Sequence, residues 1–207
     1  MKKTGLCLLV FLAVAALNGC TGMADAMSQM GGMGVVTEKV STFDGAKVVE
    51  VTPQFLYNPK RLGGNSYRLG ARWNSLSPEY VALIMEYSSS TSMNSAYVSL
   101  TELNVNISGS IYSYKATDLT DHSSSGWNSI SKTIYTTSMN SVVVPFELLE
   151  EMLTAEDVRL RVHSGDGYED SVFSQERIPG GQATALLSLR EFMSRVQAIR
   201  EGAAISG

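Results

Sequence analysis

The chain has 207 residues, of which 44% are hydrophobic, and a formal net charge of −4. This length suits one domain with a substantial apolar core. The mild excess of acidic residues argues against nucleic acid as a partner, because phosphate backbones are bound by clustered Lys and Arg. Both cysteines, Cys7 and Cys20, lie near the N-terminus, so the long remainder of the chain offers no thiolate for catalysis or for a metal.

The N-terminus has the pattern of an export signal. Two lysines precede an uncharged, mostly apolar run over residues 5–16, which is shorter than the ~20 residues of a membrane-spanning helix. Residues 17–20 then read Leu-Asn-Gly-Cys, which resembles the lipobox of bacterial lipoproteins. The resemblance implies that residues 1–19 are a signal peptide, that cleavage leaves Cys20 first, and that this cysteine carries diacylglycerol and a further acyl chain such as palmitate.

Lipid on Cys20 would also fix the location of the protein. Two or more acyl chains anchor a protein stably, whereas a single chain binds a membrane only marginally. By resemblance to the sorting rule of enterobacterial lipoproteins, Thr21 in place of Asp after the cysteine implies the outer membrane. In a Gram-negative envelope, the protein would then face the periplasm from that membrane.

Residues 20–34 are predicted to be a flexible tether, because glycine and small residues are frequent there. Four methionines, Met23, Met27, Met30 and Met33, recur at steps of four, three and three. Three interpretations stay open: a plain tether that is rich in methionine, an apolar stripe that lies on lipid or on a partner, and thioether ligands for Cu(I). The spacing resembles the Met-rich segments of exported copper-handling proteins. We expect no metal site built from other residues.

The chain from residue 35 to 207 is predicted to form a single β-rich domain, whose first part alternates apolar and polar residues at the period of a strand. We expect a bulge near Thr101 or Glu102, where the apolar parity switches, and a two-residue hairpin turn at Gly109-Ser110. The serine runs 88–90 and 123–125 are predicted to be polar loops. The expected strands cover residues 47–51, 67–73, 80–87, 97–107, 111–115, 129–136 and 142–144.

The last third of the domain mixes helix and strand. A short helix is expected over about 145–153, because Pro145 suits the first turn of a helix. A hairpin follows, with strands at 158–162 and 168–173. The apolar residues of 182–200 recur at steps of four and three, which predicts a C-terminal amphipathic helix. The predicted fold is an antiparallel β-sandwich or partly open barrel with this helix packed on it.

The sequence offers few residues for catalysis. The only histidines are His122 and His163, and the Gly-x-Ser-x-Gly motif of a hydrolase is missing. We therefore expect that the protein is not an enzyme and has no cofactor. An envelope hydrolase is the third hypothesis, ranked below the two binding functions described next.

Arginines provide the candidate binding residues. Arg68 and Arg72 alternate on one predicted strand, and Arg159 and Arg161 on another. If these strands were neighbours, the four guanidiniums would form an anion-binding patch. The other interpretation is cross-strand pairing with acidic residues, namely Glu86, Glu102 or Glu169.

The general layout resembles that of uncharacterised β-rich lipoproteins of bacterial envelopes. The expected function is a non-catalytic binding or assembly component of a larger envelope complex, with an unidentified envelope protein as its partner. The alternative is a periplasmic carrier of a small ligand or of copper.

Overall fold

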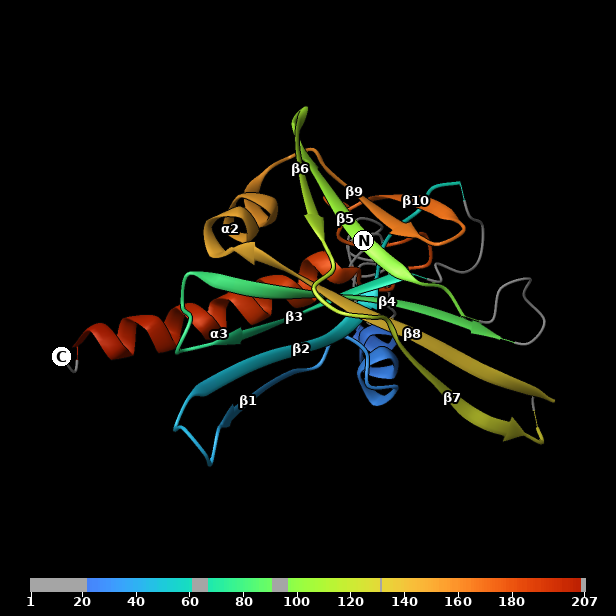
Figure 1. The fold of residues 1–207 in the computed structure, drawn as a ribbon, viewed down its shortest axis with the longest axis horizontal. Helices are drawn as coiled ribbons and strands as arrows, with labels where there is room; N and C mark the ends of the chain where they lie inside the picture. The colour runs from blue at the N-terminus through green and yellow to red at the C-terminus, as the bar shows by residue number, and fades with distance from the viewer. Residues whose placement is uncertain (1–21, 61–66, 91–96, 131, 206–207) are drawn as a thin grey trace, which may run out of the picture.

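We analysed a computed structural model of the chain, which describes residues 22–60, 67–90, 97–130 and 132–205. The predicted signal peptide and Cys20 lie outside these residues. The fold is mainly β, with two antiparallel sheets and three helices, as the sequence predicted (Figure 1). None of the helices in the described part of the chain is long and apolar enough to cross a membrane.

The larger sheet is curled into half a barrel (Figure 1). In spatial order its strands are β1 (Val36–Val40), β2 (Lys47–Phe55), β3 (Tyr67–Asn74), β4 (Tyr80–Ser90), β8 (Thr133–Pro145) and β7 (Asp121–Asn128). The smaller sheet has the order β10 (Gly167–Val172), β9 (Val158–Ser164), β5 (Leu100–Ile107) and β6 (Ser110–Lys115).

The helices complete the core. α3 (Ala185–Ile205) packs against β2 and β3, and α2 (Phe146–Thr154) packs against α3 and β8. The apolar stripe of α3 predicted from the sequence is buried, with Leu189, Phe192 and Val196 fully enclosed. These side chains form one cluster with those of both sheets. The half-barrel, the smaller sheet and α3 therefore share a single core.

The bulge predicted near Thr101 or Glu102 is confirmed, since the pairing of β5 with β9 shifts register between Leu100 and Glu102. The predicted hairpin turn lies one residue earlier than expected. Ile107 pairs with Ser110, so the turn residues are Ser108 and Gly109, with φ of 50° and 99°. Two positive φ values are what a type I′ turn requires.

Three predictions about the larger sheet were wrong. Residues 88–90 belong to β4 and residues 123–125 to β7, although both runs of serine were predicted to be loops. The two strands expected at 129–136 and 142–144 are one strand, β8. Pairing explains the three errors. β4 and β8 stay in register from Tyr80–Pro145 to Ser90–Tyr135, and β8 also pairs with Ser123 and Ser124 of β7, so strand structure is imposed on polar residues.

Residues 22–34 are not the flexible connection predicted from the sequence. Residues 22–30 form a helix, which we call the N-terminal helix. It ends in a Schellman motif: the N–H of Gly32 donates to the carbonyl of Gln29, and the N–H of Met33 donates to that of Ser28. Gly32 has the positive φ, 76°, that this motif needs. The glycines that indicated flexibility therefore terminate a helix.

Gly70 allows β2 and β3 to approach at a second bulge, where their pairing shifts register between Val51 and Gln54. This bulge accommodates Pro53 inside β2, a strand that the sequence analysis ended before the proline. A Cβ atom on Gly70 would lie 2.5 Å from the carbonyl oxygen of Val51 and 2.9 Å from the nitrogen of Pro53.

We predict that Gly70→Ala lowers the free energy of unfolding by about 1–3 kcal/mol, because the added methyl overlaps backbone atoms that no rotamer change can move. The measurement is urea unfolding. Gly22→Ala is the matched control, since nothing lies within 4 Å of its Cβ position. Equal stability of Gly70→Ala and wild type would contradict the close approach.

Candidate binding surfaces

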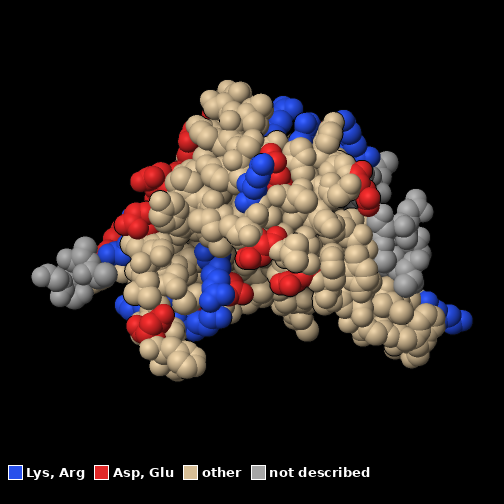
Figure 2. All heavy atoms as spheres, in the orientation of Figure 1, with Lys and Arg blue, Asp and Glu red and all other residues tan. Residues whose placement is uncertain are grey.

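The outer face of the smaller sheet carries a hollow with a volume of about 730 Å³. The face is set by strand alternation: Leu160 and Val162 of β9 point into the core, so Arg159 and Arg161 point outward. Figure 2 shows Lys and Arg side chains gathered along the upper edge of the molecule, over this sheet. The lining residues are Asn58, Pro59, Lys60, Asn104, Asn106, Ile111, Arg159, Leu160, Arg161, Tyr168, Glu169, Asp170, Ser171 and Val172.

Asn104 is the residue of the hollow with the clearest spare hydrogen-bonding capacity. Its Nδ2 lies 3.0 Å from Nε2 of His163, which holds the amide in place. Its Oδ1 is buried and has no hydrogen-bond partner in the described part of the chain. A flipped amide would leave the nitrogen unpaired instead, so either orientation leaves one buried polar end of Asn104 without a hydrogen bond among the described residues.

Arg161 is the most constrained cation of the hollow. Its guanidinium makes two hydrogen bonds with Asp170, of 2.6 and 3.0 Å, and lies 3.9 Å from the centre of the Tyr168 ring. The hydrogen bond from Arg161 lowers the pKa of Asp170 below its ordinary value. The stabilisation from this pair is therefore fully present above the ordinary carboxyl pKa and is lost as the pH falls through the lowered one. Since both side chains are about half exposed, the contribution is small.

The four predicted arginines do not form one patch. β3 and β9 belong to different sheets, so Arg68 and Arg72 lie apart from Arg159 and Arg161. Arg68 instead makes a hydrogen-bonded ion pair with Glu86 on β4, as the alternative interpretation expected. Arg159 and Arg161 remain together in the hollow.

Among the residues that the structure describes, neither histidine forms an accessible pair with a hydroxyl. Nδ1 of His122 lies 3.2 Å from Oγ of Ser138. Ser138 is fully buried, and its hydroxyl also accepts the N–H of Val98. A substrate cannot reach that oxygen, so this contact stabilises the packing of β8. Among the described residues, His, Cys, Asp and Glu form no cluster of three or more that could hold a metal ion.

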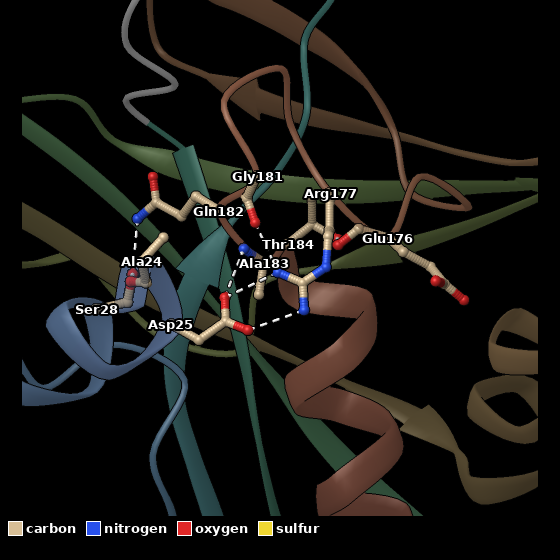
Figure 3. A network of polar contacts seen from close by, with 9 residues as sticks. All are labelled: Ala24, Asp25, Ser28, Glu176, Arg177, Gly181, Gln182, Ala183 and Thr184. Carbon is tan, nitrogen blue, oxygen red and sulfur yellow. Dashed lines mark hydrogen bonds and ion pairs between the residues drawn. The ribbon is translucent and has the colours of Figure 1, made fainter. Parts of the chain in front are cut away.

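The N-terminal helix is clamped to the loop before α3 (Figure 3). Asp25 accepts hydrogen bonds from both terminal nitrogens of Arg177, at 3.0 and 2.9 Å, and one from the N–H of Ala183. Beside it, the amide of Gln182 donates to Oγ of Ser28 at 2.8 Å. The carboxylate raises the pKa of Arg177 through these hydrogen bonds, and the ion pair is partly shielded from water. A bidentate pair with such shielding fixes orientation as well as position.

The clamp leaves three of the four methionines pointing outward. Met23, Met27 and Met30 are 68%, 68% and 89% exposed. Met33 follows the helix and is half-buried, so it is not part of their stripe. The predicted stripe is therefore three residues long and lies opposite the side of the helix that carries Ser28, which is buried.

The third surface is the β7–β8 arm, which we define as residues 121–139. It projects from the body at the lower right of Figure 1. All eight residues of β7 are exposed, and within the described residues no strand pairs with its outer edge. Trp127 and Ile130, near the tip, are 65% and 93% exposed. Figure 2 shows that this region is almost uncharged.

Comparison of the chain with protein-family models, with curated proteins and with solved structures finds no match.

Sequence reasoning missed the residues that complete each surface. Asn104 lies on the outer face of β5, and the alternation of apolar and polar residues along that strand could have indicated this. The ion pair between Asp25 and Arg177 joins residues 152 positions apart in the sequence, so no local sequence pattern could have predicted it. β7 lacked an apolar face and so gave no strand signal.

We predict that Asp25→Asn releases the N-terminal helix while the rest of the fold stays intact, because a neutral amide with a single acceptor oxygen replaces the carboxylate that accepts both hydrogen bonds from Arg177. Amide hydrogen exchange over residues 22–30 should accelerate, and the free energy of unfolding should fall by only about 1 kcal/mol. Asp157→Asn is the control, since its pair with Arg159 is exposed and closes no tertiary contact. Unchanged protection of residues 22–30 in Asp25→Asn would show that the clamp does not hold the helix.

Proposed function

We propose that this protein is a lipid-anchored component of a bacterial cell envelope. In this proposal it binds or assembles a partner protein without catalysis, and the β7–β8 arm is the element that binds the partner. The observation that carries the proposal is the exposed edge of β7. An unpaired strand edge offers a row of N–H and C=O groups to another extended segment.

The two edges of the larger sheet differ in a way that supports this use of β7. At the other edge, β1 carries Glu38 and Lys39, and both side chains form ion pairs. Charged residues on an edge strand oppose pairing with a further strand. Between Asp121 and Glu147, by contrast, Lys132 is the only Asp, Glu, Lys or Arg. One edge is thus protected from pairing and the other is left available.

The partner segment should be extended and mostly uncharged. A bulge between Ser124 and Trp127 divides the edge of β7 into two short stretches. Main-chain hydrogen bonds would form along Asp121–Ser124, and an apolar side chain of the partner would pack on Trp127. An exposed Trp is the residue type most enriched at the energetic centre of protein interfaces.

Anchoring through Cys20 rests on the lipobox resemblance. The N-terminal helix, which begins at residue 22, is compatible with it, because the fold begins directly after the proposed lipid attachment.

A small-ligand carrier is the second candidate, and the hollow on the smaller sheet favours it. The volume of about 730 Å³ is in the range of small-molecule sites. The cations Arg159 and Lys60, which line the hollow, suit an anion with hydrogen-bonding oxygens. The copper carrier is supported less, because Met33 is half-buried whereas Met23, Met27 and Met30 are exposed.

The arm is tested by photo-crosslinking in cells, with a crosslinking amino acid at position 127. We predict a discrete envelope protein joined at this position. The double change of Ser123→Lys and Ser124→Lys should abolish the product, because it places charge on both faces of the edge. Cys20→Ala should remove the protein from the membrane fraction.

Position 43 is the matched control for crosslinking, because Phe43 is an aromatic residue that is 99% exposed in the turn between β1 and β2. Identical products from positions 43 and 127, or a product from 127 that survives the lysine substitutions, would refute the arm as the binding element.

The hollow is tested by equilibrium dialysis against inorganic phosphate and acetate. If the protein is a carrier of small anions, binding should be tighter than about 1 mM and should weaken about tenfold in Arg159→Gln, the loss of one charge-assisted contact. Arg72→Gln, on the other sheet, should bind as wild type does. No binding below the millimolar range would exclude this candidate.

A further inference from the structure

The outward face of the N-terminal helix contributes nothing to the core formed by the described residues. Met23, Met27 and Met30 recur at steps of four and three and form one exposed stripe, with Ala26 exposed among them. The single charged residue of the helix, Asp25, is held by Arg177 on another side. An uncharged, apolar helix face is therefore presented to the surroundings by a clamp that prevents the helix from turning it inward.

We infer that this face is a membrane seat, which rests on the lipid surface beside the acylated Cys20. The inference deepens the proposed function and rests on its lipid anchor. Seating adds a second contact to the anchor and sets the orientation of the whole domain relative to the membrane.

The length of the connection argues for lipid as the occupant. In the proposed cleaved form only Cys20 and Thr21 would precede residue 22, and two extended residues span at most about 7 Å. An amphipathic helix at a membrane surface sinks about 5–10 Å into the boundary between headgroups and acyl chains. The acyl chains on Cys20 would thus hold the start of the helix at the depth at which its methionines contact lipid. A partner protein would have to compete with a membrane that is already within reach.

The chemistry of the stripe also suits this boundary. Methionine is unbranched and polarizable, so its side chain adapts to an irregular apolar environment such as lipid. Nothing in the stripe carries a charge that would need to leave the acyl region. The ion pair between Asp25 and Arg177 fixes the N-terminal helix relative to α3 and the core, so the orientation of the helix on lipid would also set the orientation of the domain.

The experiment measures proximity to lipid for individual methyl groups. Residues 20–207, which include every described residue, are labelled with ¹³C-methyl Met and Ala and coupled through Cys20 to a maleimide lipid in phosphatidylcholine nanodiscs. A nitroxide on the acyl chains of the nanodisc lipid enhances relaxation of nearby methyls. We expect about threefold faster relaxation at Ala26, Met27 and Met30 than at Ala24, whose side of the helix faces the fold, as a seated helix implies.

Two variants separate seating from mere closeness to the anchor. An insertion of about eight Gly and Ser residues between Thr21 and Gly22 lengthens the connection without supplying apolar surface. The enhancement at Ala26 should survive the insertion alone and disappear when Met23→Gln, Met27→Gln and Met30→Gln are added. Met139, which is exposed on β8, is the internal control and should show no enhancement.

Equal enhancement at Ala24 and Ala26, or loss of all enhancement on insertion, would overturn the seat. A second contradicting result would be that micromolar Cu(I) shifts the methyl resonances of the three methionines while the lipid nitroxide enhances none of their relaxation rates. That result would favour a metal site over the membrane seat. Failure of the anchor itself is read separately, by mass spectrometry of the Cys20 peptide from native membranes. An unmodified Cys20 there would refute the proposed anchor and, with it, the seat in the cell, while the nanodisc result would still report on the affinity of the face.

Discussion

The concave face of the half-barrel must be covered, and the way in which it is covered determines the rest of the structure. α3 covers the side of β2 and β3, while the smaller sheet and α2 cover the side of β8. Full burial of an apolar side chain contributes about 1.5–3 kcal/mol, so three enclosed residues of α3, Leu189, Phe192 and Val196, contribute an amount similar to the net stability of a domain. α3 is therefore part of the core, and β7, which lies beyond both covers, is left exposed.

The start of α3 is also where the N-terminal helix is attached. The carboxylate of Asp25 accepts the N–H of Ala183, two residues before α3 begins, and pairs with Arg177 in the same loop. A negative group close to a helix N-terminus is favoured by the helix dipole. The N-terminal helix thus has a defined orientation relative to the core, where glycine content had predicted a tether. If the protein is anchored at Cys20, a flexible tether would leave the domain free to reorient, whereas a helix fixed to the core would hold the domain in a defined orientation.

Periodicity predicted much of the fold but little of the candidate surfaces. β3, β9 and α3 were found because one face of each is apolar and the other is not. The serine-rich parts of β4 and β8 were missed because their inward residues are polar and are satisfied by distant partners: the amide of Asn140 donates to the carbonyls of Leu100 and Asp118. Buried polar groups that find such partners cost little, yet they remove the apolar alternation that a strand prediction needs. The pairing of Arg68 with Glu86 was anticipated because neighbouring strands commonly pair charges, whereas Asp25 and Arg177 meet only through the tertiary fold.

A continuous series of packed elements joins the arm to the N-terminal helix. β8 runs without interruption from the tip of the arm at Thr133 to Pro145, where α2 begins directly at Phe146. Its pairing with β4 extends over the whole of β4, so the arm is a continuation of the sheet and has no hinge at its base. α2 packs on α3, and the start of α3 holds the N-terminal helix through Asp25. If the N-terminal helix rests on lipid as proposed, a partner bound to β7 would be held at a defined place and angle relative to that surface. Such an arrangement suits a component that positions another protein in an envelope complex better than a carrier, which has to release its ligand and move.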